Sequence, residues 1–393
     1  MWLNDYYWCA EKEKSMKKKL LLILIAIGFL VGYGSFHFFF DAEDHGPVYQ
    51  EITVADSVFE NKFYFEQLIE EEQLIYKELY QGVLDHAEDI TVHCLDAEKA
   101  GQILHSVVYD FSDIFWTDGS SDMLTYEESH VVVQPTYTYS LEEREVMQAE
   151  IDAQVNAILS QVSMESSDYE KIKYIYEALV NDVAYVENAP DNQNIYSTFV
   201  RKETVCAGYA KANKYLLERL GVYCIYVLGT AAEESHAWNI VQCNGVMCYV
   251  DVTWADPLFS EDVQQIPEEI LYDYLCCSDS MLGTTHQADA SYHYPECTSN
   301  DWEYYHLNQM HYESAERKTL LNAMYTSINA KEGSTTFKFA DGNVYMQARD
   351  MLVNELIEKA GEHLCNRYGL RQIECTYGEY AELNRFVVYW KYE

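Results

Sequence analysis

The stretch TVCAGYAKANKYLLERLG, residues 204–221, decides the fold. Its apolar residues recur at helical spacing, and Gly221 is a typical residue just after a helix end. We therefore predict a helix that begins at Cys206. The unpaired N–H groups and the dipole of a helix start favour a thiolate and can also donate to an oxyanion.

Two further segments follow in the order that a thiol nucleophile requires. SHAWNIV, residues 235–241, is a predicted strand that carries His236, and VMCYVDVTWADP, residues 246–257, carries Asp251. Between them, Asn244-Gly245 is a strong signal for a two-residue hairpin. This register puts His236 and Asp251 on the same face as diagonal neighbours, within reach of a hydrogen bond. Cysteine, histidine and carboxylate are the three parts of an activated thiol nucleophile.

These three segments resemble the motifs of the bacterial transglutaminase-like superfamily over about residues 165–258. The resemblance implies an α+β fold with a papain-like transglutaminase core. It also implies that Cys206 is the nucleophile, His236 the base and Asp251 the residue that orients the base. The family contains crosslinking enzymes, peptidases and amidases, which share an acyl-thioester intermediate.

From this resemblance we expect a thiol-dependent amide hydrolase acting on a peptide or protein substrate. The alternatives are a protein-glutamine acyltransferase and a non-catalytic adhesion or scaffold module. We expect no cofactor and no metal ion. His286 and His293 lack ligand-like company in the sequence and are therefore weaker site candidates than His236. For the second oxyanion donor, the sequence offers only Tyr185 and Gln193.

The overall charge excludes one class of partner. The chain of 393 residues has 65 acidic and 26 basic residues and a formal charge of −39, whereas nucleic-acid binding needs basic surfaces. The eleven cysteines include no CxxC pair, which argues against zinc ribbons and thioredoxin-type sites.

The amino terminus predicts a membrane anchor. Residues 20–40 form an apolar run that is long enough to span a bilayer, preceded by three lysines and followed by acidic residues. The positive-inside rule places residues 1–19 in the cytoplasm and the rest outside the cell membrane. The alternative is a cleaved signal peptide over residues 16–34, which would give a secreted product. Translation starts at either Met1 or Met16.

The rest of the chain divides into four predicted parts. Helices and strands of similar order flank the central segment, which suggests a duplicated α-β-α-β-β module. The parts are a connector (41–64), an N-terminal α/β module (65–140), the catalytic domain (141–300) and a C-terminal α/β module (305–393).

Overall fold

A computed structural model of the chain describes residues 47–126, 129–256, 270–373 and 375–392. The predicted cytoplasmic tail and the predicted anchor at residues 20–40 lie outside these ranges. Among the helices that are described, none is long and apolar enough to cross a membrane.

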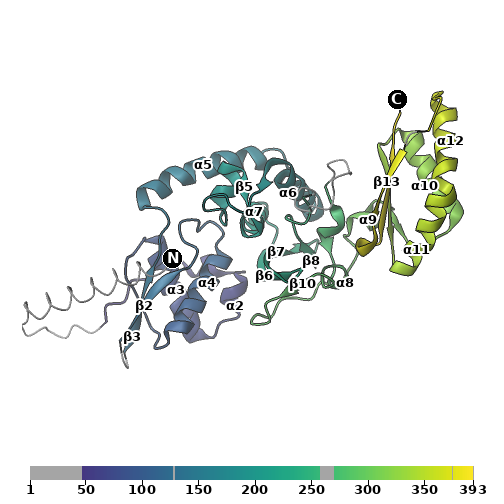
Figure 1. The fold of residues 1–393 in the computed structure, drawn as a ribbon. Coiled ribbons are helices and arrows are strands. Elements are labelled where there is room, and N and C mark those ends of the chain that lie inside the picture. Colours follow the sequence, from purple (N-terminus) through teal and green to yellow (C-terminus); the bar gives the residue numbers. More distant parts are fainter. Residues whose placement is uncertain (1–46, 127–128, 257–269, 374, 393) are drawn as a thin grey trace, which may run out of the picture. The chain divides into compact units, whose positions relative to one another are not determined.

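The N-terminal part packs helices against a small antiparallel sheet with strand order β1-β3-β2 (Figure 1). Asp96 caps α4 by accepting hydrogen bonds from two backbone N–H groups of its first turn. The elements are η1 (Asp56–Phe59), α2 (Phe63–Glu66), α3 (Glu70–Leu84), β1 (Ile90–Val92), α4 (Ala97–Asp110), β2 (Ser121–Tyr126) and β3 (His130–Pro135).

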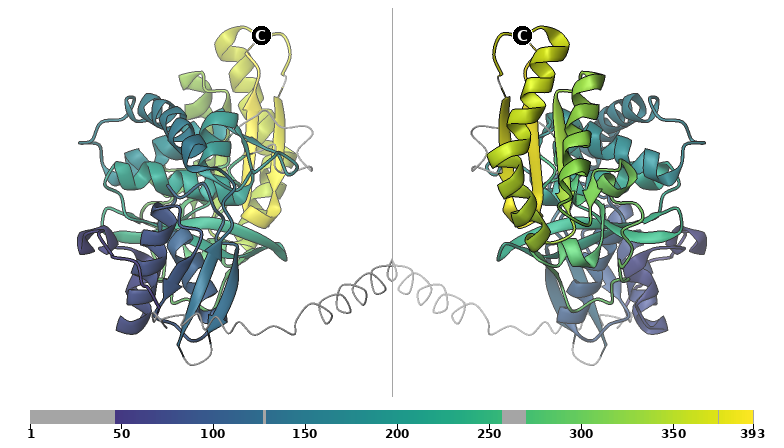
Figure 2. Two further views of the ribbon diagram at one scale, coloured as in Figure 1. Left: turned by 90° about the vertical axis from the view of Figure 1, so that its left-hand side faces the viewer. Right: turned by 90° about the vertical axis from the view of Figure 1, so that its right-hand side faces the viewer.

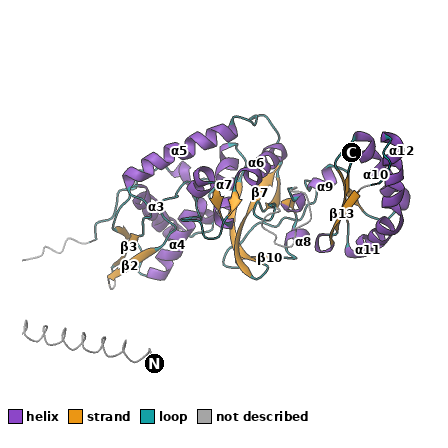
Figure 3. Cartoon of the chain, turned by 45° about the horizontal axis from the view of Figure 1, so that its top comes forward, coloured by secondary structure: helices purple, strands orange, loops and turns teal. Residues whose placement is uncertain are grey.

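The central part contains a five-stranded antiparallel sheet with strand order β10-β6-β7-β8-β9. Helix α7 packs against β6 and β7 of this sheet (Figure 3). The helices are α5 (Leu141–Leu159), α6 (Asp168–Asp182), the π-helical turn η2 (Ser197–Arg201), α7 (Cys206–Arg219), η4 (Tyr272–Tyr274) and α8 (Asp279–Leu282). The strands are β4 (Ala184–Tyr185), β5 (Glu203–Thr204), β6 (Cys224–Ala231), β7 (Glu234–Cys243), β8 (Val246–Val250), β9 (Leu275–Cys277) and β10 (His286–Ala288).

The predicted hairpin and its register are confirmed. Asn244 and Gly245 both have positive φ, as a two-residue hairpin turn requires, and Cys243 pairs with Val246. The predicted capping box of Ser140 and Glu143 is present at the start of α5.

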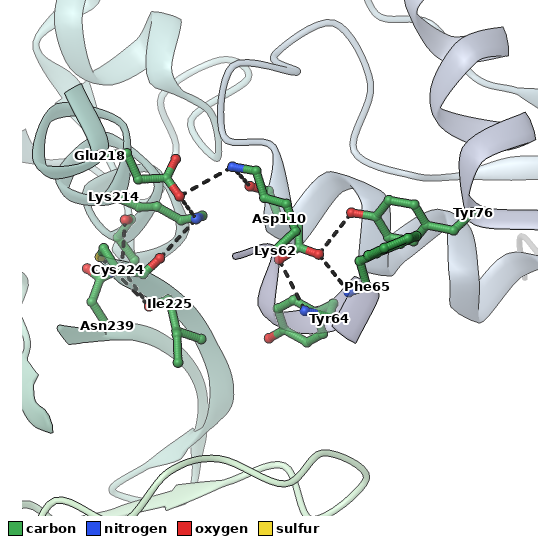
Figure 4. A network of polar contacts seen from close by, with 11 residues as sticks. Lys62, Tyr64, Phe65, Tyr76, Asp110, Lys214, Glu218, Cys224, Ile225 and Asn239 are labelled. Carbon is green, nitrogen blue, oxygen red and sulfur yellow. Dashed lines mark hydrogen bonds and ion pairs between the residues drawn. The ribbon is translucent and has the colours of Figure 1, made fainter. Parts of the chain in front are cut away.

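One continuous hydrophobic core joins the N-terminal and central parts, because its buried residues come from both. A polar network also connects them (Figure 4). Asp110, at the end of α4, is buried and accepts a hydrogen bond from the Tyr76 hydroxyl at 2.9 Å. The ammonium of Lys62 lies 3.4 Å from both the Asp110 carbonyl oxygen and a carboxylate oxygen of Glu218 on α7. This network helps to hold α7 in place.

The C-terminal part has its own core, in which helices α10, α11 and α12 pack beside a sheet of order β11-β12-β14-β13 (Figure 2). Strands β12, β14 and β13 are antiparallel in the order that β1, β3 and β2 show in the N-terminal sheet. The two flanking parts therefore share the predicted order of helices and strands. The elements are α9 (Tyr304–Leu307), β11 (His311–Tyr312), α10 (Arg317–Ala330), β12 (Ser334–Phe339), α11 (Gly342–Met351), η5 (Leu352–Leu356), α12 (Ile357–Tyr368), β13 (Cys375–Tyr380), η6 (Ala381–Leu383) and β14 (Arg385–Trp390).

Candidate active site

Cys206 is the first residue of α7, as the sequence predicts. The preceding residue, Val205, supplies no side-chain cap, so no side chain at that position occupies the amide N–H groups of the first turn. The thiol is free and half-buried, and it lines a cavity of about 630 Å³. Gly208 allows the close packing of this helix start, because a Cβ there would lie 1.9 Å from the Thr204 hydroxyl oxygen.

Hydrogen bonds of Asn192 and Asn194 fix the loop before η2 on either side of Gln193. The buried Asn192 side chain donates to the carbonyl oxygens of Val186 and Glu187, at 3.0 and 2.8 Å. The Asn194 side chain accepts from the backbone N–H groups that follow it. Gln193 is exposed between the two and lines the same cavity as Cys206.

His236 and Asp251 meet in the interior of the site. Nε2 of His236 lies 2.7 Å from Oδ2 of Asp251, and both side chains are buried. The other oxygen, Oδ1, accepts from the backbone N–H groups of Thr253 and Trp254, at 2.9 and 3.2 Å. The strand register brings the pair together, because the β7–β8 ladder ends at Asn239–Val250, just before Asp251.

Each member of the pair shifts the pKa of the other toward the charged form. Burial alone would lower the pKa of His236, but the charge and hydrogen bond of Asp251 and a further hydrogen bond with Cys206 raise it to about 10. Burial alone would raise the pKa of Asp251, but its contacts with His236 and His286 hold that pKa well below its usual range. His236 is therefore a cation at neutral pH. Since Asp251 occupies Nε2, the ring nitrogen that remains for Cys206 is Nδ1.

His286 also belongs to this site, which corrects the expectation that it stands apart. Its Nε2 lies 3.0 Å from the same Oδ2 atom of Asp251, and its Nδ1 lies 2.8 Å from the Thr285 hydroxyl. Strand β10 places it there by pairing with β6, where His286 faces Ala231. Because this pairing joins segments more than fifty residues apart, no local pattern reveals it. His293 is exposed, and its backbone N–H donates a hydrogen bond to the side-chain oxygen of Gln67, the residue that follows α2.

His236, Asp251 and His286 are also the set of side chains that could hold a metal ion. Their ligand atoms lie within 4.8 Å of one another in the described part of the chain. Two imidazoles and one carboxylate are common ligands of divalent transition metals. The hydrogen bonds among the three side chains account for the arrangement by themselves, so no step of the chemistry below depends on a metal.

A second glycine, Gly229, lines the cavity and allows two strands to pack closely there. Gly229 on β6 pairs with His236 on one side and with Ala288 on the other. A Cβ at Gly229 would lie 2.1 Å from the Gln287 carbonyl oxygen and 2.8 Å from the Trp238 ring. Only glycine lets β10, and with it His286, approach β6 this closely.

The structure thus brings Cys206, His236 and Asp251 together and adds His286. Tyr185, the other residue considered for the oxyanion, has a pKa raised to about 12 by burial and by the charge of Cys206. A thiol and a cationic imidazole at one cavity, with an ionised carboxylate buried behind the imidazole, can perform nucleophilic acyl chemistry.

The chain was compared with protein families, curated proteins and solved structures. Residues 156–255 match the transglutaminase-like superfamily, and no curated protein matches the chain. A solved structure of a TGase is 15% identical, with a TM-score of 0.26, over 46% of this chain and 53% of that one. A provisionally assigned cysteine protease from Cytophaga hutchinsonii is 14% identical, with a TM-score of 0.24, over 35% of this chain and 63% of that one.

The chain spans about half the length of the TGase. The family assignment rests on the sequence match, which includes Cys206, His236 and Asp251. Residues 156–255 of this chain are a domain of the transglutaminase-like superfamily.

Proposed function

We propose that the chain is a thiol-dependent amide hydrolase that acts on peptides or proteins through an acyl-thioester on Cys206. One observation carries the proposal: a half-buried thiol lines a cavity beside a histidine that is hydrogen-bonded to a buried carboxylate. Neither a scaffold nor an adhesion module needs this arrangement, since burying an ionised pair costs free energy unless each partner is satisfied.

The proposed reaction begins from the ion pair of the Cys206 thiolate and the His236 imidazolium. The sulfur attacks the amide carbonyl carbon, and the C–N bond breaks as His236 gives its Nδ1 proton to the leaving amine. The neutral imidazole then takes a proton from water, which attacks the thioester. The acid leaves and the thiolate–imidazolium pair is restored. Asp251 orients the ring and stabilises its charge throughout.

We propose that the oxyanion is held by the first-turn N–H groups of α7 and by the Gln193 side chain. Asn192 and Asn194 fix the backbone around Gln193, and its side chain forms no hydrogen bond with any described residue. A fixed backbone limits where this amide donor can lie, and a donor near the developing oxyanion lowers the barrier.

Transfer of the acyl group to an amine is the second candidate. One observation favours it: the exposed carboxylate of Asp289 lines the same cavity and would attract a protonated amine. Water and an amine compete for the same thioester, so the product distinguishes them.

The test is to incubate the chain with an unfolded protein substrate and a labelled primary amine in water enriched in oxygen-18. Hydrolysis places the heavy oxygen in new carboxylates, whereas transfer attaches the labelled amine. We expect heavy carboxylates with the wild type, fewer with Gln193→Leu and none with Cys206→Ala. Amine incorporation would support the acyltransferase instead. Equal products from the wild type and Cys206→Ala would exclude a role for this thiol.

We also propose, from the sequence alone, that residues 20–40 anchor the chain in the cell membrane and that the catalytic part lies outside the cytoplasm.

A further inference from the structure

Lys211, on α7, is buried without a hydrogen-bond partner among the described residues. Its side chain is only 6% exposed, yet it forms neither a hydrogen bond nor an ion pair with any described residue. An ammonium group has three N–H donors, and burying it unpaired is costly. The neighbouring lysine on the same helix, Lys214, is by contrast paired with Glu218 and with the Cys224 carbonyl oxygen.

Lys211 lines a polar cavity of about 270 Å³. The carboxylates of Asp118 and Asp191 line it too, and each already accepts a hydrogen bond. Asp118 accepts from the Ser120 N–H at 2.9 Å, and Asp191 accepts from the Tyr139 hydroxyl. The cavity is slightly smaller than typical ligand pockets, which have about 300–1,000 Å³, so it suits a group the size of one residue.

The ammonium keeps its charge at neutral pH. Burial lowers the pKa of Lys211 to about 8, against the opposing effect of Asp118 and Asp191. The cavity is therefore lined by a buried cation with unused donors and by two carboxylates that can accept hydrogen bonds.

Gln193 connects this cavity to the active site, because it lines both cavities. Tyr226 also lies between them: it lines the Cys206 cavity, and the Lys211 ammonium lies 5.8 Å from the centre of its ring. Lys211 follows Cys206 by five residues on α7, which is about 7.5 Å along the helix axis, so a group bound at Lys211 would lie within a few residues of an amide held at Cys206.

We propose that the Lys211 cavity binds the free carboxyl end of a peptide substrate, with the terminal carboxylate on Lys211 and the backbone N–H facing Asp118 or Asp191. A carboxylate supplies the acceptors that the buried ammonium lacks, and its charge pairs that of Lys211. The inference rests on the proposed function, since it specifies the substrate of the same site as one whose scissile amide lies near a carboxyl terminus.

The test is calorimetric binding of N-acetylglycine and of N-acetylglycinamide to the full chain carrying Cys206→Ala, so that no reaction is needed. The two probes differ only in the terminal charge. We expect the carboxylate to bind at least about tenfold more tightly than the amide. Lys211→Met should remove this preference, because methionine fills a similar volume without charge. Lys359→Met, which removes one exposed positive charge elsewhere, is the matched control and should keep it.

Equal affinity for the two probes, no measurable binding of either, or a preference that persists in Lys211→Met would each overturn the inference. The comparison of the two probes on the chain that carries only Cys206→Ala stands even where a Lys211 variant fails to fold. These outcomes are independent of the proposed function, because an inactive thiol would leave the binding data unchanged, and an active thiol is compatible with an empty Lys211 cavity.

Discussion

The Asn213 side chain donates a 2.9 Å hydrogen bond to the Asn239 side-chain oxygen, and this contact links the helix of Cys206 to the strand of His236. Asn239 is fully buried and also donates to the carbonyl oxygens of Ala210 and Ile225, at 3.0 and 3.2 Å. The separation of sulfur and imidazole therefore depends on an amide three residues after His236, in the same sequence motif.

Asn239→Ala should both destabilise the chain and slow the chemistry. Three hydrogen bonds are lost, at a net cost of about 1 kcal/mol each, so we expect a loss of about 3 kcal/mol in urea unfolding. Alkylation of Cys206 should slow as the helix and strand lose their register. Asn181→Ala, which removes an exposed side-chain bond on α6, is the control and should cost less than about 0.5 kcal/mol. A folded Asn239→Ala with unchanged alkylation would show that the link does not position the site.

His286 should act as a positioning residue through Asp251. His286→Leu removes one donor from Oδ2 of Asp251. We expect the rate of Cys206 alkylation near neutral pH to fall by about tenfold, which is the usual size of the loss when a supporting hydrogen bond around a site is removed. His286→Gln keeps an N–H donor and should restore most of the rate. His293→Leu, a change to an exposed histidine nearby, should have no effect. Equal rates for the Leu and Gln variants would mean that His286 contributes only packing.

Gly229→Ala should displace β10 and thereby disturb the site. The added Cβ would meet the Gln287 carbonyl oxygen, so β10 must move, and overpacking of this kind costs about 1–3 kcal/mol. Thermal unfolding should therefore occur at a lower temperature. Gly333→Ala is the matched control, since nothing lies within 4 Å of its Cβ position and its φ is not positive. Similar stabilities of the two variants would argue against close packing at Gly229.

The membrane anchor is tested by topology. Protease added to intact cells should digest the residues beyond Asp41, since the lysines before the apolar run favour a cytoplasmic amino terminus. An otherwise identical chain with Lys17, Lys18 and Lys19 moved to the other side of the run is the control for orientation. Full protection of the wild-type chain would reverse the proposed orientation.

The sequence predicts most of the elements because their signals are local. The capping box of Ser140, the start of α7 at Cys206 and the turn at Asn244-Gly245 each depend on residues within a few positions. The register of that hairpin was enough to predict that His236 and Asp251 share a face, because a two-residue turn fixes which residues of the two strands are paired.

The features that the sequence does not reveal depend on long-range pairing. His286 reaches Asp251 only because β10 joins the edge of the sheet at β6, and Gly229 matters only because of that approach. The Lys211 cavity likewise combines a helix, the segment after α4 and the loop before η2, which no periodicity connects. Helix lengths and turns are set locally, whereas neighbours across a sheet are set by tertiary packing.

The central claim is that His236 and Asp251 activate Cys206, and the rate of Cys206 alkylation against pH tests it most directly. His236 has its pKa raised to about 10, so its charge supports the thiolate at neutral pH, and this support is lost as the pH rises through about 10. We expect iodoacetamide to modify Cys206 at pH 6–7 ahead of the half-buried Cys365 and Cys375, as read by mass spectrometry. In His236→Ala the rate at that pH should fall and approach the wild-type rate only where an ordinary thiol ionises, above about 8.5. Equal labelling of the three thiols, or an unchanged profile in His236→Ala, would contradict the account.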